Sequence, residues 1–79
     1  MKHPSVLQYV SQNVRHYRNL RGLSQQQLAD FAGLSRRMVA GVETGQDNIS
    51  LAKLSLIADV LEVDFAQMIA APEQQGQAV

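Results

Sequence analysis

Two adjacent arginines, Arg36 and Arg37, stand at the start of a predicted helix. They follow Ser35, a residue type that caps helix N-termini, so both fall in the first turn. Cations at this end meet the positive pole of the helix dipole, which has a modest cost in stability. An anionic partner would offset that cost. The chemistry that these residues favour is therefore recognition of an anion.

Catalytic chemistry has no comparable support in the chain. The sequence has no nucleophile paired with a base, no glycine-rich loop that could cradle a phosphate and no paired carboxylates at a plausible site. It has no cysteine, and its two histidines, His3 and His16, have no ligand-type neighbours at metal-binding spacing. We therefore expect neither an enzyme nor a bound metal or cofactor.

The arginines belong to the second of two short helices that a glycine separates. Ser24 and Gln27 form an S-x-x-Q capping box at the start of the first helix, and Gly33 is suited to end it. Ser35 caps the second helix, which is expected to run from Arg36 to about Thr44. A helix, a short glycine turn and a capped helix that begins with arginines are typical of a DNA-binding helix-turn-helix.

Three further helices are expected to position this pair. They span Ser5 to about Arg21, Leu51 to Leu61, and Phe65 to about Ala70. Apolar residues repeat at helical spacing in the first and second of these: Val6, Leu7, Val10, Val14, Tyr17 and Leu20, then Leu51, Leu54, Ile57, Ala58 and Leu61. No strand pattern or repeat occurs, so the sequence predicts an all-α fold, a compact five-helix bundle.

The domain organisation follows from these helices. We expect a flexible arm at residues 1–4, one helix-turn-helix domain at residues 5–71, and a disordered tail or linker at residues 72–79, where glutamine is frequent. No apolar run reaches the roughly 18 residues of a membrane span, so the expected location is the cytoplasm.

Charge is divided between the two halves of the chain. The formal net charge is zero, which by itself argues against a nucleic-acid partner. Residues 1–40, however, hold six lysines and arginines and one acid, a net charge of +5, and residues 41–79 hold the reverse, a net charge of −5. The charge is therefore compatible with DNA binding on one face.

Motif fragments between Val10 and Ile69 resemble one known family. They are Val14-x-x-Tyr17-Arg18, Gly22-Leu23-Ser24-Gln25-x-x-Leu28-Ala29, Gly33-Leu34-Ser35, Val39-x-x-Val42-Glu43-x-Gly45 and Leu54-x-x-Ile57-Ala58-x-x-Leu61. At these spacings the chain resembles the Cro/C1-type (XRE) helix-turn-helix regulators, which are related to phage repressors. The resemblance implies a lambda-repressor-like fold that binds double-stranded DNA, with the helix 36–44 in the major groove.

The resemblance also implies which residues contact the bases. They are Ser35, Arg36, Arg37, Ala40 and Gly41. Because the arginine fork matches the O6 and N7 acceptors of guanine, a guanine-containing site is expected. Gly41 has no side chain where many relatives carry a long polar one, which would allow close approach to the DNA.

Contacts to the DNA backbone are expected from a second group. Its members are Gln25, Met38, Asn48, Ser50 and Lys53. Gln25 is expected to donate to a phosphate with the help of its helix N-terminus. Met38 lies between two faces, so its side chain could instead touch a thymine methyl or stay within the protein. Relatives commonly have a proline before the fourth helix, where this chain has Ile49.

Other residues are given structural roles. The resemblance implies that Arg18 and Glu43 form an internal ion pair between the first helix and the DNA-binding helix. The core is expected to contain Leu28, Ala29, Leu34, Val39, Val42, Ile57 and Leu61. A surface that pairs two copies is expected at Val60, Val63, Phe65, Met68 and Ile69, although these residues could simply close the core.

The leading hypothesis is a sequence-specific, double-stranded DNA-binding transcriptional regulator, a repressor, that acts as a homodimer. Pairing is expected because one helix reads only a few base pairs of an operator. Two alternatives stay open. The chain could be the DNA-binding fragment of a longer ligand-sensing regulator, for example one with a cupin domain, or the antitoxin of a toxin–antitoxin pair.

Overall fold

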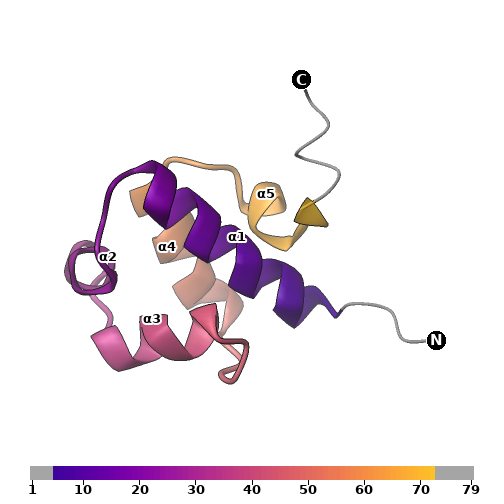
Figure 1. Ribbon diagram of the computed structural model, residues 1–79, viewed down its shortest axis with the longest axis horizontal. Coiled ribbons are helices and arrows are strands. Elements are labelled where there is room, and N and C mark those ends of the chain that lie inside the picture. Colours follow the sequence, from indigo (N-terminus) through magenta and orange to yellow (C-terminus); the bar gives the residue numbers. More distant parts are fainter. Residues whose placement is uncertain (1–4, 73–79) are drawn as a thin grey trace.

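All five predicted helices are present in the computed structural model, which describes residues 5–72 (Figure 1). They are α1 (Val6–Leu20), α2 (Gln25–Ala32), α3 (Arg36–Glu43), α4 (Leu51–Leu61) and α5 (Phe65–Ile69). No strand occurs among the described residues, so the all-α class and the five-helix architecture are confirmed. The predicted α1 is one residue longer at each end than the observed helix, and the predicted α3 and α5 are one residue longer at their C-terminal ends. The extra residues are the flanking caps.

Helix starts follow from hydrogen bonds over short stretches of chain. In four helices a serine hydroxyl accepts from the backbone N–H three residues later, at 3.0 to 3.2 Å: Ser5, Ser24, Ser35 and Ser50. Three glutamines accept in return from the backbone N–H of the capping residue, as the S-x-x-Q and D-x-x-Q patterns predicted: Gln8, Gln27 and Gln67.

The core joins all five helices. Helix α1 crosses the molecule and contacts α3, α4 and α5, while α2 packs against α3 and α4 (Figure 1). Each helix contributes at least one large, fully buried side chain: Val14, Leu28, Val39, Val42, Ile57, Leu61 and Met68. Of the predicted core, only Leu34 is partly buried, packed against the cluster rather than within it. The core thereby sets the position of α3 relative to α1 and α2.

Three residues of the predicted apolar stripes are exposed. The relative exposure of Val6, Leu20 and Leu51 is 56%, 70% and 71%. Each is the first or last residue of its helix, so the neighbouring helices do not extend far enough to cover it. Helical spacing shows the direction of the buried face but not the length over which a partner covers it.

The predicted pairing surface also needs correction. Met68 is fully buried in the core, and Val60, Val63 and Phe65 pack against the core and are partly buried. Only Ile69 is exposed, at 38%. The helix α5 packs onto α1 and α4, so Phe65 and Met68 close the core together with Val60 of α4 and Val63 of the connecting turn.

Two helices end in the left-handed conformation. Gly33 ends α2 with φ +73°, as predicted, and its N–H donates to carbonyls of the last turn. Glu62 ends α4 in the same way with φ +60°, although it is not a glycine. A side chain in this conformation is strained, so the end of α4 is less favourable than the end of α2.

The predicted arm at residues 1–4 and nearly all of the predicted tail, residues 73–79, lie outside the described residues. Within residues 5–72, no helix combines the length and the apolar character that crossing a membrane requires.

Candidate nucleic-acid interface

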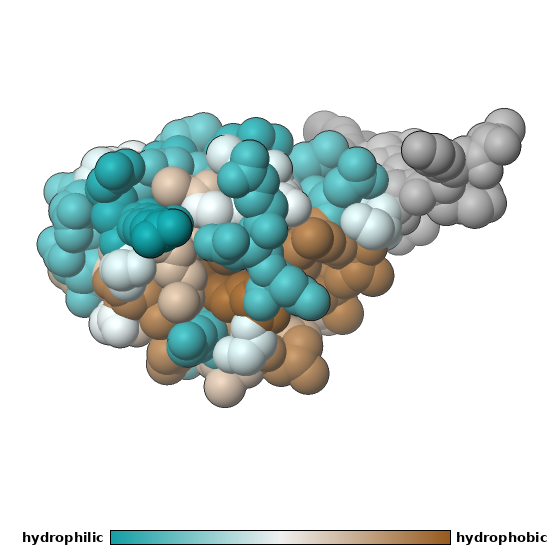
Figure 2. Space-filling view, turned by 90° about the horizontal axis from the view of Figure 1, so that it is seen from below, coloured by the Kyte–Doolittle hydropathy of each residue, from teal (hydrophilic) through white to brown (hydrophobic). Residues whose placement is uncertain are grey.

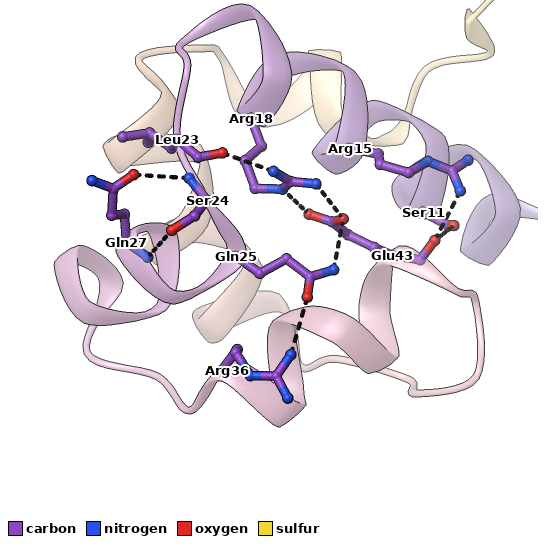
Figure 3. Close-up of polar contacts among 9 residues, drawn as sticks. All are labelled: Ser11, Arg15, Arg18, Leu23, Ser24, Gln25, Gln27, Arg36 and Glu43. Atoms are coloured by element: carbon purple, nitrogen blue, oxygen red, sulfur yellow. Dashed lines mark hydrogen bonds and ion pairs between the residues drawn. The ribbon is translucent and has the colours of Figure 1, made fainter.

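The C-terminal end of α3 is attached to α1 by an ion pair between the buried Glu43 and the half-buried Arg18 (Figure 3). Glu43 is 2% exposed, and its two carboxylate oxygens accept from Arg18 Nε at 2.5 Å and Nη2 at 3.0 Å. Arg18 Nη1 donates to the carbonyl of Leu23 at 2.7 Å. The bond to Glu43 raises the pKa of Arg18, against the opposing effect of burial, so the guanidinium stays charged. The structure thus brings together the two residues that the resemblance paired.

Two further α1 residues bind the backbone of the same glutamate. The carbonyl of Glu43 accepts from Ser11 Oγ at 2.6 Å and from Arg15 Nη1 at 3.3 Å. Sequence reasoning missed Ser11, which is buried. Its spacing from Leu7 and Val14 places it on the apolar stripe of α1, and that signal could have identified it.

Asn13 is a second buried polar residue that sequence reasoning missed. Its Nδ2 donates to the carbonyls of Met68 at 2.8 Å and Ala70 at 2.9 Å. It lies three residues after Val10 and four before Tyr17, so its place on the buried face could also have been recognised. These bonds attach the short helix α5 to α1.

Gln25 connects the two ends of α3 (Figure 3). Its Nε2 donates to Glu43 Oε1 at 3.1 Å, and its Oε1 accepts from Arg36 Nη1 at 3.4 Å. Both ends of the amide that was expected to reach a phosphate are therefore engaged within the protein. A phosphate contact by this side chain requires that one of the two bonds be given up.

The N-terminal end of α3 is open to solvent. Ser35, Arg36 and Arg37 are exposed, and Ala40 and Gly41 are half-buried one turn further on. Ser35 Oγ accepts from the N–H of Met38, which leaves its own proton available to a partner. Within the described chain, neither arginine forms an ion pair, and Arg37 makes no hydrogen bond. These donors are available to an anion or to base edges.

The loop between α3 and α4 separates two surfaces. On one side, Arg37, Ala40 and Gly41 line a shallow polar hollow of about 280 Å³ together with Thr44, Gln46 and Asp47. Asn48 instead borders an apolar hollow of about 160 Å³. The structure thus brings three of the five base-contacting candidates to one hollow, whereas the phosphate candidate Asn48 borders the other.

The remaining phosphate candidates are spread along the chain. Ser50 and Lys53 are exposed at the start of α4, where Ser50 caps the helix, and Met38 is half-buried in α3.

The face of the molecule that includes α3 is drawn in Figure 2, which looks at Figure 1 from below. Hydrophilic residues cover much of this face, and hydrophobic residues gather toward its lower and right parts.

Gly41 has an unexpected neighbour. A Cβ placed on Gly41 would overlap the carboxylate of Asp47, so the space beside the helix is occupied by the protein's own side chain. The interpretation that Gly41 leaves room for DNA did not foresee this residue. The position of Asp47 depends on how the loop after α3 folds back onto the helix, and no residue spacing in the sequence reveals this fold.

Comparison with known proteins identifies the family. The helix-turn-helix family model (HTH_3) matches residues 14–68, which contain most of the five helices. The control protein C.SmaI of Serratia marcescens is 34% identical over 64 residues, covering 81% of this chain and 76% of that protein.

Solved structures show the same fold. The hypothetical transcription factor NHTF from Neisseria superposes with a TM-score of 0.88 at 28% identity, covering all of this chain and 94% of that one. The restriction-modification controller protein C.Esp1396I, solved as a tetramer in complex with its natural 35 base-pair operator, gives a TM-score of 0.75 at 30% identity over 85% of this chain and 92% of that one. The chain therefore belongs to the Cro/C1-type (XRE) helix-turn-helix family of DNA-binding transcription regulators.

Proposed function

We propose that this protein recognises an operator sequence by placing the N-terminal turn of α3 in the major groove. One observation carries the proposal. Arg37 and Arg36 are exposed at one end of a helix whose other end is fixed by buried polar bonds. A helix held at one end that presents exposed guanidinium groups at the other matches the acceptors of guanine in the major groove. Ser35, Ala40 and Gly41 lie close enough along α3 to share the contact surface.

Several similar proteins are controllers of restriction–modification systems, and one of them was solved on its natural operator. This supports a double-stranded DNA operator as the ligand of this chain. We propose that binding represses transcription by occupying such an operator. The proposal requires no reaction at the site, so it assigns no enzymatic activity. It places the protein where a bacterial operator lies, in the cytoplasm.

A second copy of the chain completes the proposed assembly. Since C.Esp1396I binds its operator as a tetramer, a symmetric pair is the natural unit. The apolar hollow beside α1 provides the surface, because its lining includes the exposed side chains of Val6, Leu51 and Ile69. This surface replaces the predicted one, of which only Ile69 is retained. Leu51→Asp should convert a dimer into a monomer in sedimentation analysis, while Leu20→Asp, also exposed but outside the hollow, should not.

Selection of bound sites from random duplex DNA tests the proposal. The wild-type protein should enrich a guanine-containing half-site, and Arg36→Ala or Arg37→Ala should lose the preference for guanine at a defined position. Arg21→Ala removes an equal charge at the far end of α1 and should leave the preferred sequence unchanged. If both α3 variants retain the wild-type preference at every position, α3 does not read the operator in this way.

A further inference from the structure

A carboxylate lies beside α3 where the helix itself has no side chain. Gly41 follows Arg37 by one turn, and a Cβ built on Gly41 would come within 3.1 Å of Asp47 Cβ and overlap the Asp47 carboxylate. Asp47 therefore fills the volume that a side chain at position 41 would fill. The DNA-facing surface of α3 thus includes a residue from the following loop.

The backbone of the loop holds Asp47 in this place. The carbonyl of Gly41 accepts from the N–H of Gln46 at 3.0 Å and from the N–H of Asp47 at 3.1 Å. It also accepts from Thr44 Oγ1 at 3.1 Å. Because three donors converge on one carbonyl of α3, the loop is folded back onto the helix. These bonds hold the main chain of Asp47 beside Gly41, and its carboxylate lies against the helix there.

Within residues 5–72 the carboxylate of Asp47 has no hydrogen-bond or ion-pair partner. Asp47 is exposed, and among residues 5–72 no lysine or arginine lies within 4.0 Å of its oxygens. It lines the polar hollow with Arg37, which is likewise unpaired. The same hollow is therefore lined by a donor-only group and an acceptor-only group.

A guanidinium and a carboxylate on one surface match a particular combination of base edges. An ionised carboxylate accepts from the amino groups that cytosine and adenine present in the major groove, and it meets only acceptors at guanine O6 and N7 or thymine O4. We propose that Asp47 is a specificity-determining residue that accepts from the amino group of cytosine or adenine next to the guanine contacted by Arg37. This inference rests on the proposed placement of α3 in the major groove.

The test repeats the selection of bound duplexes with Asp47→Asn and Asp47→Ala. Asp47→Ala should reduce the preference for the amino-bearing base at one position of the half-site by about ten-fold, the usual size of a lost base contact. Asp47→Asn has the same shape but adds donors, so it should admit guanine or thymine at that position. Asp59→Ala, an exposed carboxylate of α4 outside the hollow, removes the same charge and should leave the preference unchanged.

Gly41→Ala provides an independent arm. The added Cβ displaces the Asp47 carboxylate without touching its chemistry, so this variant should lose preference at the same position as Asp47→Ala. Combining the two substitutions should add nothing further. Alanine favours the helix over glycine, but the added Cβ lies close to Asp47. Thermal melting therefore has to show that each variant is folded before its base preference is compared.

Three outcomes would overturn the inference. The first is a wild-type preference that persists at every position in Asp47→Ala and Gly41→Ala. The second is a uniform gain of affinity in Asp47→Ala for all sequences, which would show that the carboxylate only repels the DNA backbone. The third is a wild-type protein that selects no DNA sequence. That result would contradict the proposed function as well, whereas the first two outcomes contradict only the role of Asp47.

Discussion

The two ends of α3 have opposite environments although the helix is only eight residues long. At the C-terminal end, Glu43 is buried and bonded by side chains of α1 and α2. At the N-terminal end, Arg36 and Arg37 are exposed. The comparison shows that one end holds the helix in the fold and the other is free for recognition. Substitutions at the two ends should therefore affect different measurements.

Removing the buried carboxylate should have the largest effect. Glu43→Ala leaves the Arg18 guanidinium without its partner at a site where its side chain is only 14% exposed, so the free energy of unfolding should fall by about 3–5 kcal/mol. Urea denaturation measures this change. The double variant Arg18→Met with Glu43→Leu should lose clearly less unfolding free energy than the sum of the losses in Arg18→Met and Glu43→Leu alone. A loss below about 1 kcal/mol for Glu43→Ala would show that the pair is not structural.

The exposed end should show the opposite behaviour. Arg37→Ala should weaken binding to the selected operator by about 1–3 kcal/mol, because a bidentate base contact is lost. Its unfolding free energy should stay within about 0.5 kcal/mol of wild type, since the residue is exposed and makes no bond within residues 5–72. Fluorescence anisotropy with a labelled duplex gives the affinity. A stability loss comparable to that of Glu43→Ala would remove the contrast between the two ends.

Gln25 tests whether the two ends are independent. Gln25→Ala removes one bond to Glu43 and one to Arg36, so unfolding should become easier by about 1 kcal/mol. If the side chain also contacts a phosphate, affinity should fall equally for all DNA sequences, which binding to matched and mismatched duplexes distinguishes. Gln26→Ala is the matched control, because within residues 5–72 its side chain bonds only to Asp30, on the surface. A change of base preference in Gln25→Ala would mean that the amide positions Arg36.

The smallest effect is expected far from α3, at the end of α4. Glu62→Gly relieves the left-handed strain and loses an exposed ion pair with Arg21, so stability should rise by up to about 1 kcal/mol. Gly33→Ala, at the equivalent position of α2, should lower it by a similar amount, about 1 kcal/mol. Differential scanning calorimetry compares both. Operator affinity should not change in Glu62→Gly, and a change there would contradict a recognition surface confined to α3 and its neighbours.

Local features of the fold could be predicted because their causes are local. Ser24 and Gln27 form a capping box through bonds that span three residues, and Gly33 ends α2 through its own conformational freedom. The apolar spacing likewise identified Val14, Ile57 and other core residues. The exposed ends Val6 and Leu51 could not be recognised, because their environment depends on how far other helices extend.

The candidate site was predictable only in part for a similar reason. The position of Arg36 and Arg37 in the first turn of α3 could be predicted from the cap at Ser35 and from the family pattern. The bond of Ser11 to Glu43 and the place of Asp47 beside Gly41 depend on the packing of α1 and of the loop against α3. Such contacts join residues that are distant in the sequence or that approach only after the chain turns back. The same limit explains why the pairing surface was expected on the inner side of α5.

The 3.4 Å bond between Arg36 and Gln25 has a consequence for the thermodynamics of binding. A free arginine side chain has about 2 kcal/mol of rotamer entropy, part of which is lost when it is ordered on DNA. Arg37 must lose this freedom at the moment of contact. Arg36 is already restrained before it meets the operator and exchanges one hydrogen bond for another. The two adjacent arginines should therefore contribute to affinity by different routes, Arg37 with a larger entropic penalty and Arg36 with a smaller gain in enthalpy.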